Sequence, residues 1–276
     1  GTGEALAVQG NADLSIGTLT VSGSSALKVE MYGTPSHQLT IGKILGSGTT
    51  ASTTVELYTN SGNNTTANHF ILGAEGETYG DDLFTGTVWV TSKTSQGASS
   101  RATTDVYLAA QDVLRDATLK LSNWASNYNN TRISLSLGTD AKVAGIAAQD
   151  NGNNASLTNR GSYIRSGSLS VTQPDGIANF VSTSNQAYTL EITGSGTYTA
   201  DSRILDKVNL HMNGSGTQTF TGTLSNMSYF DGSITVSKGK LVLTPNSTLS
   251  THAVEVAAGA ELTINPTGVI TASATM

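Results

Sequence analysis

The chain has 276 residues, of which 12% are charged, and its formal net charge is −6 at pH 7. Its basic residues are scattered singly, which excludes the concentrated cationic surface that nucleic-acid binding requires. Cysteine is absent, which excludes disulfides, thiolate metal sites and cysteine nucleophiles. No stretch approaches the ~18 consecutive apolar residues of a membrane-spanning helix, so we expect no transmembrane segment.

The low charge does not indicate a disordered linker. Disordered chains lack β-branched residues, whereas Val, Ile and Thr are abundant here beside Gly, Ser and Asn. Proline occurs four times, so long ladders of backbone hydrogen bonds would rarely be interrupted. Composition therefore predicts an all-β protein with a polar outer surface.

Short alternating runs fill the N-terminal third of the chain. Each run has apolar residues at every second position and is bounded by Gly, Ser or Thr, which is typical of strands with one buried face. The predicted strands include Leu19–Val21, Leu27–Val29, Leu39–Ile41 and Val55–Leu57.

The middle of the chain continues this pattern at Val88–Val90 and Ile133–Leu137. Tracts rich in Asn and Gly predict projecting loops at residues 60–68, 127–130 and 149–154.

The segment 105–118 fits two structures. Its apolar residues fall at helical spacing, which allows a short helix over the sheet. Val106–Leu108 and Leu119–Leu121 also alternate, and we predict two strands here.

A repeat of twenty residues marks the C-terminal third. Gly194-Ser-Gly-Thr197 returns as Gly214-Ser-Gly-Thr217, and Gly239 returns as Gly259. Loop lengths in a hairpin fold would drift, so this constant spacing favours parallel stacking of equivalent strands, at about twenty to twenty-five residues per coil.

The sequence therefore predicts a single β-solenoid domain over residues 1–276. The repeat is most regular over residues 186–265, and the composition shows no domain boundary.

The stretch Gly214-Ser-Gly-Thr-Gln-Thr-Phe-Thr-Gly222, followed by Ile234–Leu243, resembles the autotransporter-associated β-strand repeat. The resemblance extends from about Leu135 to Ile264. It implies a right-handed parallel β-helix, a single-stranded solenoid within the passenger of a larger bacterial surface protein. Such passengers are exported across the outer membrane of Gram-negative bacteria and are displayed or released. The family supplies no catalytic residues, and we expect no cofactor.

The densest acidic cluster consists of Glu75, Glu77, Asp81 and Asp82, with glycines between them. Oxygen ligands on a Gly-rich turn can hold Ca²⁺, which makes these four residues candidate metal ligands. Their spacing matches neither the EF-hand loop nor the Gly-Gly-x-Gly-x-Asp repeat. A solvated acidic loop is therefore the interpretation that we favour.

Three aromatic residues are candidate glycan contacts. Trp89 lies between Val88 and Val90, so it points outward if the valines point inward. Trp124 and Tyr128 lie in an Asn- and Ser-rich loop, where exposed rings can stack on sugar faces beside amide groups. The alternative, which we prefer, is that these rings cover a coil edge or cap a loop.

The four histidines are isolated and the sequence has no nucleophile elbow, so we predict that the chain is not an enzyme. We expect a cell-surface or secreted stalk or adhesin-like module, whose partners could be host or matrix glycans or proteins. A glycan-binding module and a polysaccharide-active β-helix are the alternatives, and the second requires carboxylates that converge on one groove. Solenoid ends expose free strand edges, so we also predict end-to-end self-association.

Overall fold

The computed structural model describes residues 4–9, 13–22, 26–32, 38–47, 52–60, 67–93, 102–122, 131–148, 161–166, 186–204, 207–221, 230–244, 249–265 and 270–272. The regular elements in this part of the chain are all β-strands. Among the same residues, no helix has the length and apolarity needed to cross a membrane.

Most strands belong to three sheets, which we call sheets A, B and C. Sheet A has ten strands, in the order β1 (Glu4–Gln9), β3 (Leu27–Tyr32), β5 (Thr54–Asn60), β7 (Thr87–Lys93), β9 (Leu114–Leu121), β11 (Ala141–Ala147), β13 (Tyr188–Ile192), β16 (Val208–Met212), β18 (Ile234–Val236) and β21 (Val254–Val256). Sheet B has seven, in the order β15 (Ser202–Ile204), β12 (Gly161–Ser166), β10 (Thr131–Leu137), β8 (Ala102–Leu108), β6 (Ala67–Leu72), β4 (Gln38–Ser47) and β2 (Leu14–Ser22). Sheet C has four, β14 (Thr197–Ala200), β17 (Thr217–Phe220), β19 (Lys240–Leu243) and β22 (Glu261–Ile264), and a last pair joins β20 (Leu249–Thr251) to β23 (Ile270–Ala272).

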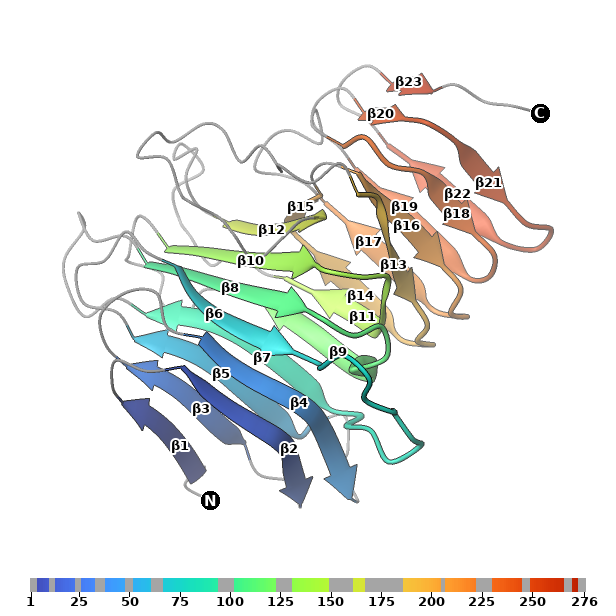
Figure 1. Cartoon of the computed structure of the whole chain (residues 1–276). Coiled ribbons are helices and arrows are strands. Elements are labelled where there is room, and N and C mark those ends of the chain that lie inside the picture. The colour runs from blue at the N-terminus through green and yellow to red at the C-terminus, as the bar shows by residue number, and fades with distance from the viewer. Residues whose placement is uncertain are drawn as a thin grey trace.

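Neighbouring strands in all three sheets are parallel. From β1 to β12 the chain enters sheets A and B alternately, so each of these coils runs through sheet A and returns through sheet B (Figure 1). The chain is all-β and folds into a right-handed parallel β-helix, which confirms the predicted fold class. The ambiguous segment 105–118 contributes to strands β8 and β9 and a turn between them, as predicted.

The length of a coil varies more than the repeat predicts. Leu190 lies beside Leu210, and Ile234 beside Val254, at the expected distance of twenty positions. Thr54 lies beside Thr87, which is thirty-three positions away. Ala141 lies beside Leu190, forty-nine positions away. The estimate of twenty to twenty-five residues per coil is therefore wrong for much of the chain, because its coils carry longer connections.

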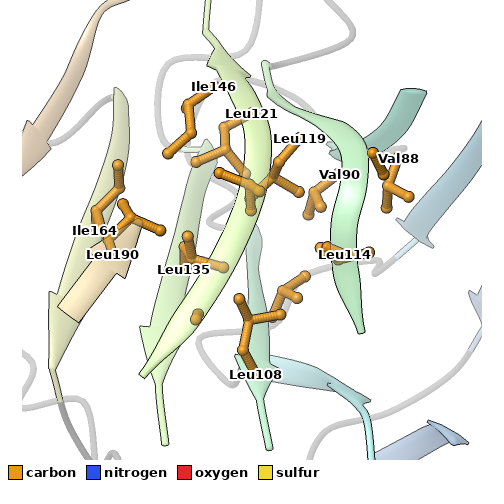
Figure 2. Close-up of a cluster of buried hydrophobic side chains, with 14 of the residues drawn as sticks. Val88, Val90, Leu108, Leu114, Leu119, Leu121, Leu135, Ile146, Ile164 and Leu190 are labelled. Carbon is orange, nitrogen blue, oxygen red and sulfur yellow. The ribbon is translucent and has the colours of Figure 1, made fainter. Parts of the chain in front are cut away.

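The interior consists of columns of apolar side chains. Leu57, Val90 and Leu121 occupy equivalent positions on successive strands of sheet A, and each is at most 1% exposed. Figure 2 shows Val90 and Leu121 among the buried side chains that face one another across the coil. Burying each such side chain contributes roughly 1.5–3 kcal/mol, so the columns are a main source of stability.

The glycine repeat has a steric cause. The turn after β16 lies directly on the turn after β13, and the Gly216 amide donates to the Gly194 carbonyl at 3.1 Å. A Cβ atom on Gly214 would lie 2.1 Å from the carbonyl oxygen of Gly194. Glycine is required here because the turns of neighbouring coils touch through their backbones. In the later coils, Gly239 and Gly259 occupy their turns with positive φ angles of 62° and 82°, consistent with the turns predicted there.

Sheet C begins beside β11, and the sequence did not predict it. The register between β9 and β11 shifts between Val143 and Gly145, whose partners on β9 are Leu114 and Thr118. Residues of β11 up to Val143 pair with β13, whereas Ala148 forms a parallel bridge with Ala200 of β14. The single strand β11 thus has two shorter strands, β13 and β14, as its neighbours in the next coil. From β13 onward, each strand of sheet A is followed by a strand of sheet C.

Candidate functional site

Trp89 lies on the outer face of sheet A, as predicted. Val88 and Val90 on either side are fully buried in the core, so the intervening ring points away from it. In the neighbouring strands, the same outward position is occupied by Lys28, Glu56 and Lys120. We call Lys28, Glu56, Trp89 and Lys120 the Trp89 column.

The ring of Trp89 has partners within the protein. The Lys120 ammonium lies 4.5 Å from the ring centroid, which is a cation–π contact. The indole N–H donates to the hydroxyl of Ser122 at 2.8 Å and to its carbonyl at 3.3 Å. A sugar that stacked on this ring face would therefore have to displace Lys120.

Glu56 is the carboxylate of this column. It is 4% exposed, and its Oε2 lies 3.7 Å from the Lys28 ammonium. Burial raises the pKa of Glu56, and the nearby charge of Lys28 only partly opposes this effect. The arrangement gives one buried carboxyl group beside an ammonium, and burial favours the protonated form of this carboxyl group.

The predicted acidic cluster lies in the connection between β6 and β7, which we call the acidic loop (residues 73–86). Leu83 and Phe84, both 2% exposed, anchor this loop. Leu83 forms an antiparallel bridge with Leu45, and the Phe84 amide donates to the Ile44 carbonyl at 3.1 Å. The loop is thereby held against the end of strand β4.

Two cations bind the acidic loop from different coils. The Lys43 ammonium lies 2.6 Å from a Glu77 oxygen. The Arg115 guanidinium lies 4.0 Å from Asp81 and 3.2 Å from Asp116, and it donates to the Gly80 carbonyl at 3.0 Å. Two carboxylates thus share one guanidinium, and the pairing neutralises part of the acidic charge.

The four predicted metal ligands are not brought together. Glu75, Glu77, Asp81 and Asp82 are all exposed. Within the described ranges, no group of three or more acidic or histidine side chains has the geometry to hold a metal ion. The geometry is that of a surface loop fixed by ion pairs.

A buried polar cluster on the outer face of sheet B was missed by sequence reasoning. Val106 and Leu108 of β8 face the core, so Asp105, which directly precedes Val106 in this strand, faces outward, yet it is 1% exposed. Its carboxylate accepts hydrogen bonds from the hydroxyls of Ser134 and Ser136 on β10.

Arg165 on β12 completes this cluster. It is 5% exposed, and its guanidinium donates to Asp105 Oδ2 at 3.2 Å and to Ser136 Oγ at 2.9 Å. The four residues join three successive coils. No sequence motif could have found them, because the connections that separate these strands differ in length and set no regular spacing.

Of the remaining candidates, Trp124 and Tyr128 lie outside the described residues. His211 shares a register position with Glu191 one coil earlier, and its Nε2 lies 2.9 Å from the Ser237 hydroxyl. His252 is exposed beside Asp231. His211 and His252 therefore make separate polar contacts, each with a different side chain.

No protein-family model, curated protein or solved structure matches the chain. What the outer faces of the β-helix do is therefore inferred from their own chemistry.

Proposed function

We propose that the chain is a non-enzymatic structural segment, a β-helical stalk that carries loops, within a bacterial cell-surface or secreted protein. The observation that supports this proposal is that charged side chains on the outer faces pair with one another from coil to coil. Lys28 pairs with Glu56 at 3.7 Å, Lys142 with Asp112 at 3.4 Å, and Lys240 with Glu261 at 2.6 Å. Charges arranged in this way connect neighbouring coils and keep the outer surface polar.

The cellular location in the proposal rests on the resemblance of Gly214–Leu243 to the autotransporter-associated β-strand repeat. The test is antibody labelling of intact and of permeabilised cells of the source bacterium. Equal labelling of both supports display at the surface, and labelling of the culture medium supports release. Labelling only after permeabilisation would contradict the proposal.

The absence of catalysis in this proposal is tested against the polysaccharide-active alternative. The chain is incubated with a panel of neutral and acidic polysaccharides, and new reducing ends and unsaturated products are measured. We expect no turnover above a heat-denatured control. Turnover that Asp105→Asn or Glu56→Gln abolishes, while Glu75→Gln leaves it unchanged, would establish the enzyme instead.

Glycan binding without catalysis is a second candidate function. Trp89 favours it, because this half-buried ring lies on an outer face beside Lys120 and a row of equivalent threonines, Thr54, Thr87 and Thr118. Amphipathic rings next to hydroxyl and ammonium groups are typical of sugar contacts. A glycan array is the test, with the wild type and Trp89→Ala compared. A signal that survives Trp89→Ala, or no signal at all, removes this candidate.

A further inference from the structure

Strand β4 in sheet B is only partly covered by its neighbour β6. The pairing with β6 ends where Ile41 lies beside Leu72, whereas the pairing with β2 on the other side continues to Ser47. Residues 42–47 therefore have a strand of sheet B on one side only. A strand edge of this kind presents backbone N–H and C=O groups that can pair with another extended chain.

The acidic loop covers this edge of β4 (Figure 1). Leu83 pairs with Leu45 in an antiparallel bridge, whereas the neighbouring strands of the described part of sheet B pair in parallel. Leu83 is 2% exposed, although it lies outside the apolar cluster that fills the coils. Its burial therefore reflects the packing of the loop on β4.

The loop also satisfies the backbone groups along this edge. In a strand, the N–H and C=O groups of every second residue point to the same side, and here those residues are Gly42, Ile44 and Gly46. The Gly42 carbonyl accepts a hydrogen bond from the Tyr79 hydroxyl at 3.1 Å, and the Gly46 amide donates to the Asp82 carbonyl at 3.1 Å. The Ile44 carbonyl accepts the hydrogen bond from the loop described above.

Apolar burial holds the loop more firmly than its ion pairs do. The ion pairs join side chains that are partly or fully exposed, Lys43 with Glu77 and Arg115 with Asp81. Exposed ion pairs contribute little to stability, whereas burying a leucine side chain contributes more. Leu83 is therefore the position at which a single substitution should release the loop.

We propose that the acidic loop shields a latent interface, through which two copies of this chain would pair along β4. A two-fold axis brings the same strand of two copies together in antiparallel directions, which is the direction that the loop now supplies. Leu45 of the second copy would take the place of Leu83. The Gly46 amide of each copy would donate to the Ile44 carbonyl of the other, in place of the hydrogen bonds to the loop.

A second copy matches this edge more closely than an unrelated strand would. One leucine replaces another, and each donor meets an acceptor. A two-fold axis at Leu45 places Lys43 opposite Ser47, so no like charges meet across the pair. The inference goes beyond the proposed function, because it concerns how copies of the chain are kept apart.

The test is sedimentation equilibrium of the full chain at concentrations up to about 1 mM, the range of weak association. Leu83→Asp places a charge at a buried position beside Asp81 and Asp82, so it should release the loop. We expect the average mass of this variant to rise with concentration toward twice the mass that the wild type has under the same conditions. Gly46→Pro removes the N–H of the edge, and adding it to Leu83→Asp should restore the wild-type mass.

Leu83→Met keeps an apolar side chain of similar volume, so it is the matched control and should have the wild-type mass. Leu83→Ser is a smaller change that should release the loop and form the same dimer. Hydrogen exchange checks the fold, and the amides of β8 and β10 should remain protected in every variant.

The proposal is overturned if both release variants, Leu83→Asp and Leu83→Ser, keep the wild-type mass or lose that protection. It is also overturned if the rise in mass persists after Gly46→Pro is added. Assemblies that exceed twice the wild-type mass would overturn it as well, because a two-fold contact closes on itself.

Discussion

Gln218 places an amide group inside the core of the β-helix. It is fully buried on β17, and its Oε1 accepts a hydrogen bond from the Ile146 amide at 2.9 Å. Its Nε2 donates to the Ile146 carbonyl at 3.0 Å. Ile146 follows the register shift between β9 and β11, where the pairing of β11 divides between β13 of sheet A and β14 of sheet C. One side chain thus supplies the two hydrogen bonds that an adjacent strand would supply.

Replacing Gln218 with Leu should destabilise the protein, because it leaves a buried N–H and a buried C=O without partners. Each such group costs about 1–3 kcal/mol, so we expect a loss of about 2–6 kcal/mol. Chemical denaturation measures the change. Gln111→Leu, at an exposed turn position, is the control and should have little effect. Equal losses in the two variants would contradict the role of the amide.

Glu56 makes stability depend on pH. Burial raises the pKa of its carboxyl group in the folded protein, so the folded state binds more protons than the unfolded state between the ordinary pKa and the raised one. The contribution of Glu56 to the free energy of unfolding is therefore greatest below its ordinary pKa. This contribution decreases as the pH rises from the ordinary pKa through the raised one. Glu56→Gln removes the dependence, so the variant should gain stability relative to the wild type as the pH rises above the ordinary pKa of a glutamate carboxyl group.

The measurement for Glu56 is a denaturation curve at each pH for the wild type, Glu56→Gln and Glu75→Gln. Glu75 is exposed in the acidic loop, so Glu75→Gln is the control for the loss of a carboxyl group that is not buried. A constant difference between Glu56→Gln and the wild type would show that burial does not control this carboxyl group.

At the scale of the element, the Asp105–Arg165 pair connects strands β8, β10 and β12. Arg165→Met leaves the buried carboxylate of Asp105 without its cation, which we expect to cost about 3–5 kcal/mol. Adding Asp105→Leu should restore most of this loss, because no buried charge then remains. Lys240→Met breaks the surface pair with Glu261 and should cost at most about 1 kcal/mol. Denaturation of the four proteins measures these differences, and a double variant less stable than Arg165→Met would exclude this explanation.

How far the sequence predicts these elements depends on the range of the interactions involved. Alternation is local, so runs such as Val88–Val90 predicted strands and the outward direction of Trp89. The twenty-residue repeat also predicted which turns stack. The Asp105 cluster and sheet C could not be predicted. Both depend on which residues of distant coils lie side by side, and connections of unequal length set that register.

At the scale of the whole molecule, each coil contacts mainly the coils before and after it. Stability in such a structure is close to a sum of terms for each coil and for each interface between neighbours. Sheet A runs through every coil from β1 to β21, yet no single element spans the length of the β-helix. Local damage should therefore remain local, unlike in a globular domain with one shared core.

Leu210→Asp tests this property. Leu210 is 1% exposed between Leu190 and Ile234, so the substitution places a charge inside the core column of β16. We expect hydrogen exchange to show lost amide protection in β13, β16 and β18, while β5, β7 and β9 remain protected. Asn209→Asp introduces the same side chain one position away, where Asn209 Oδ1 already accepts a hydrogen bond from the Ser233 amide at 2.9 Å. Protection in that variant should be unchanged, because an Asp side chain keeps the acceptor and the outward face tolerates its charge. If Leu210→Asp instead removed protection evenly from β5 to β18, the β-helix would unfold as one cooperative unit.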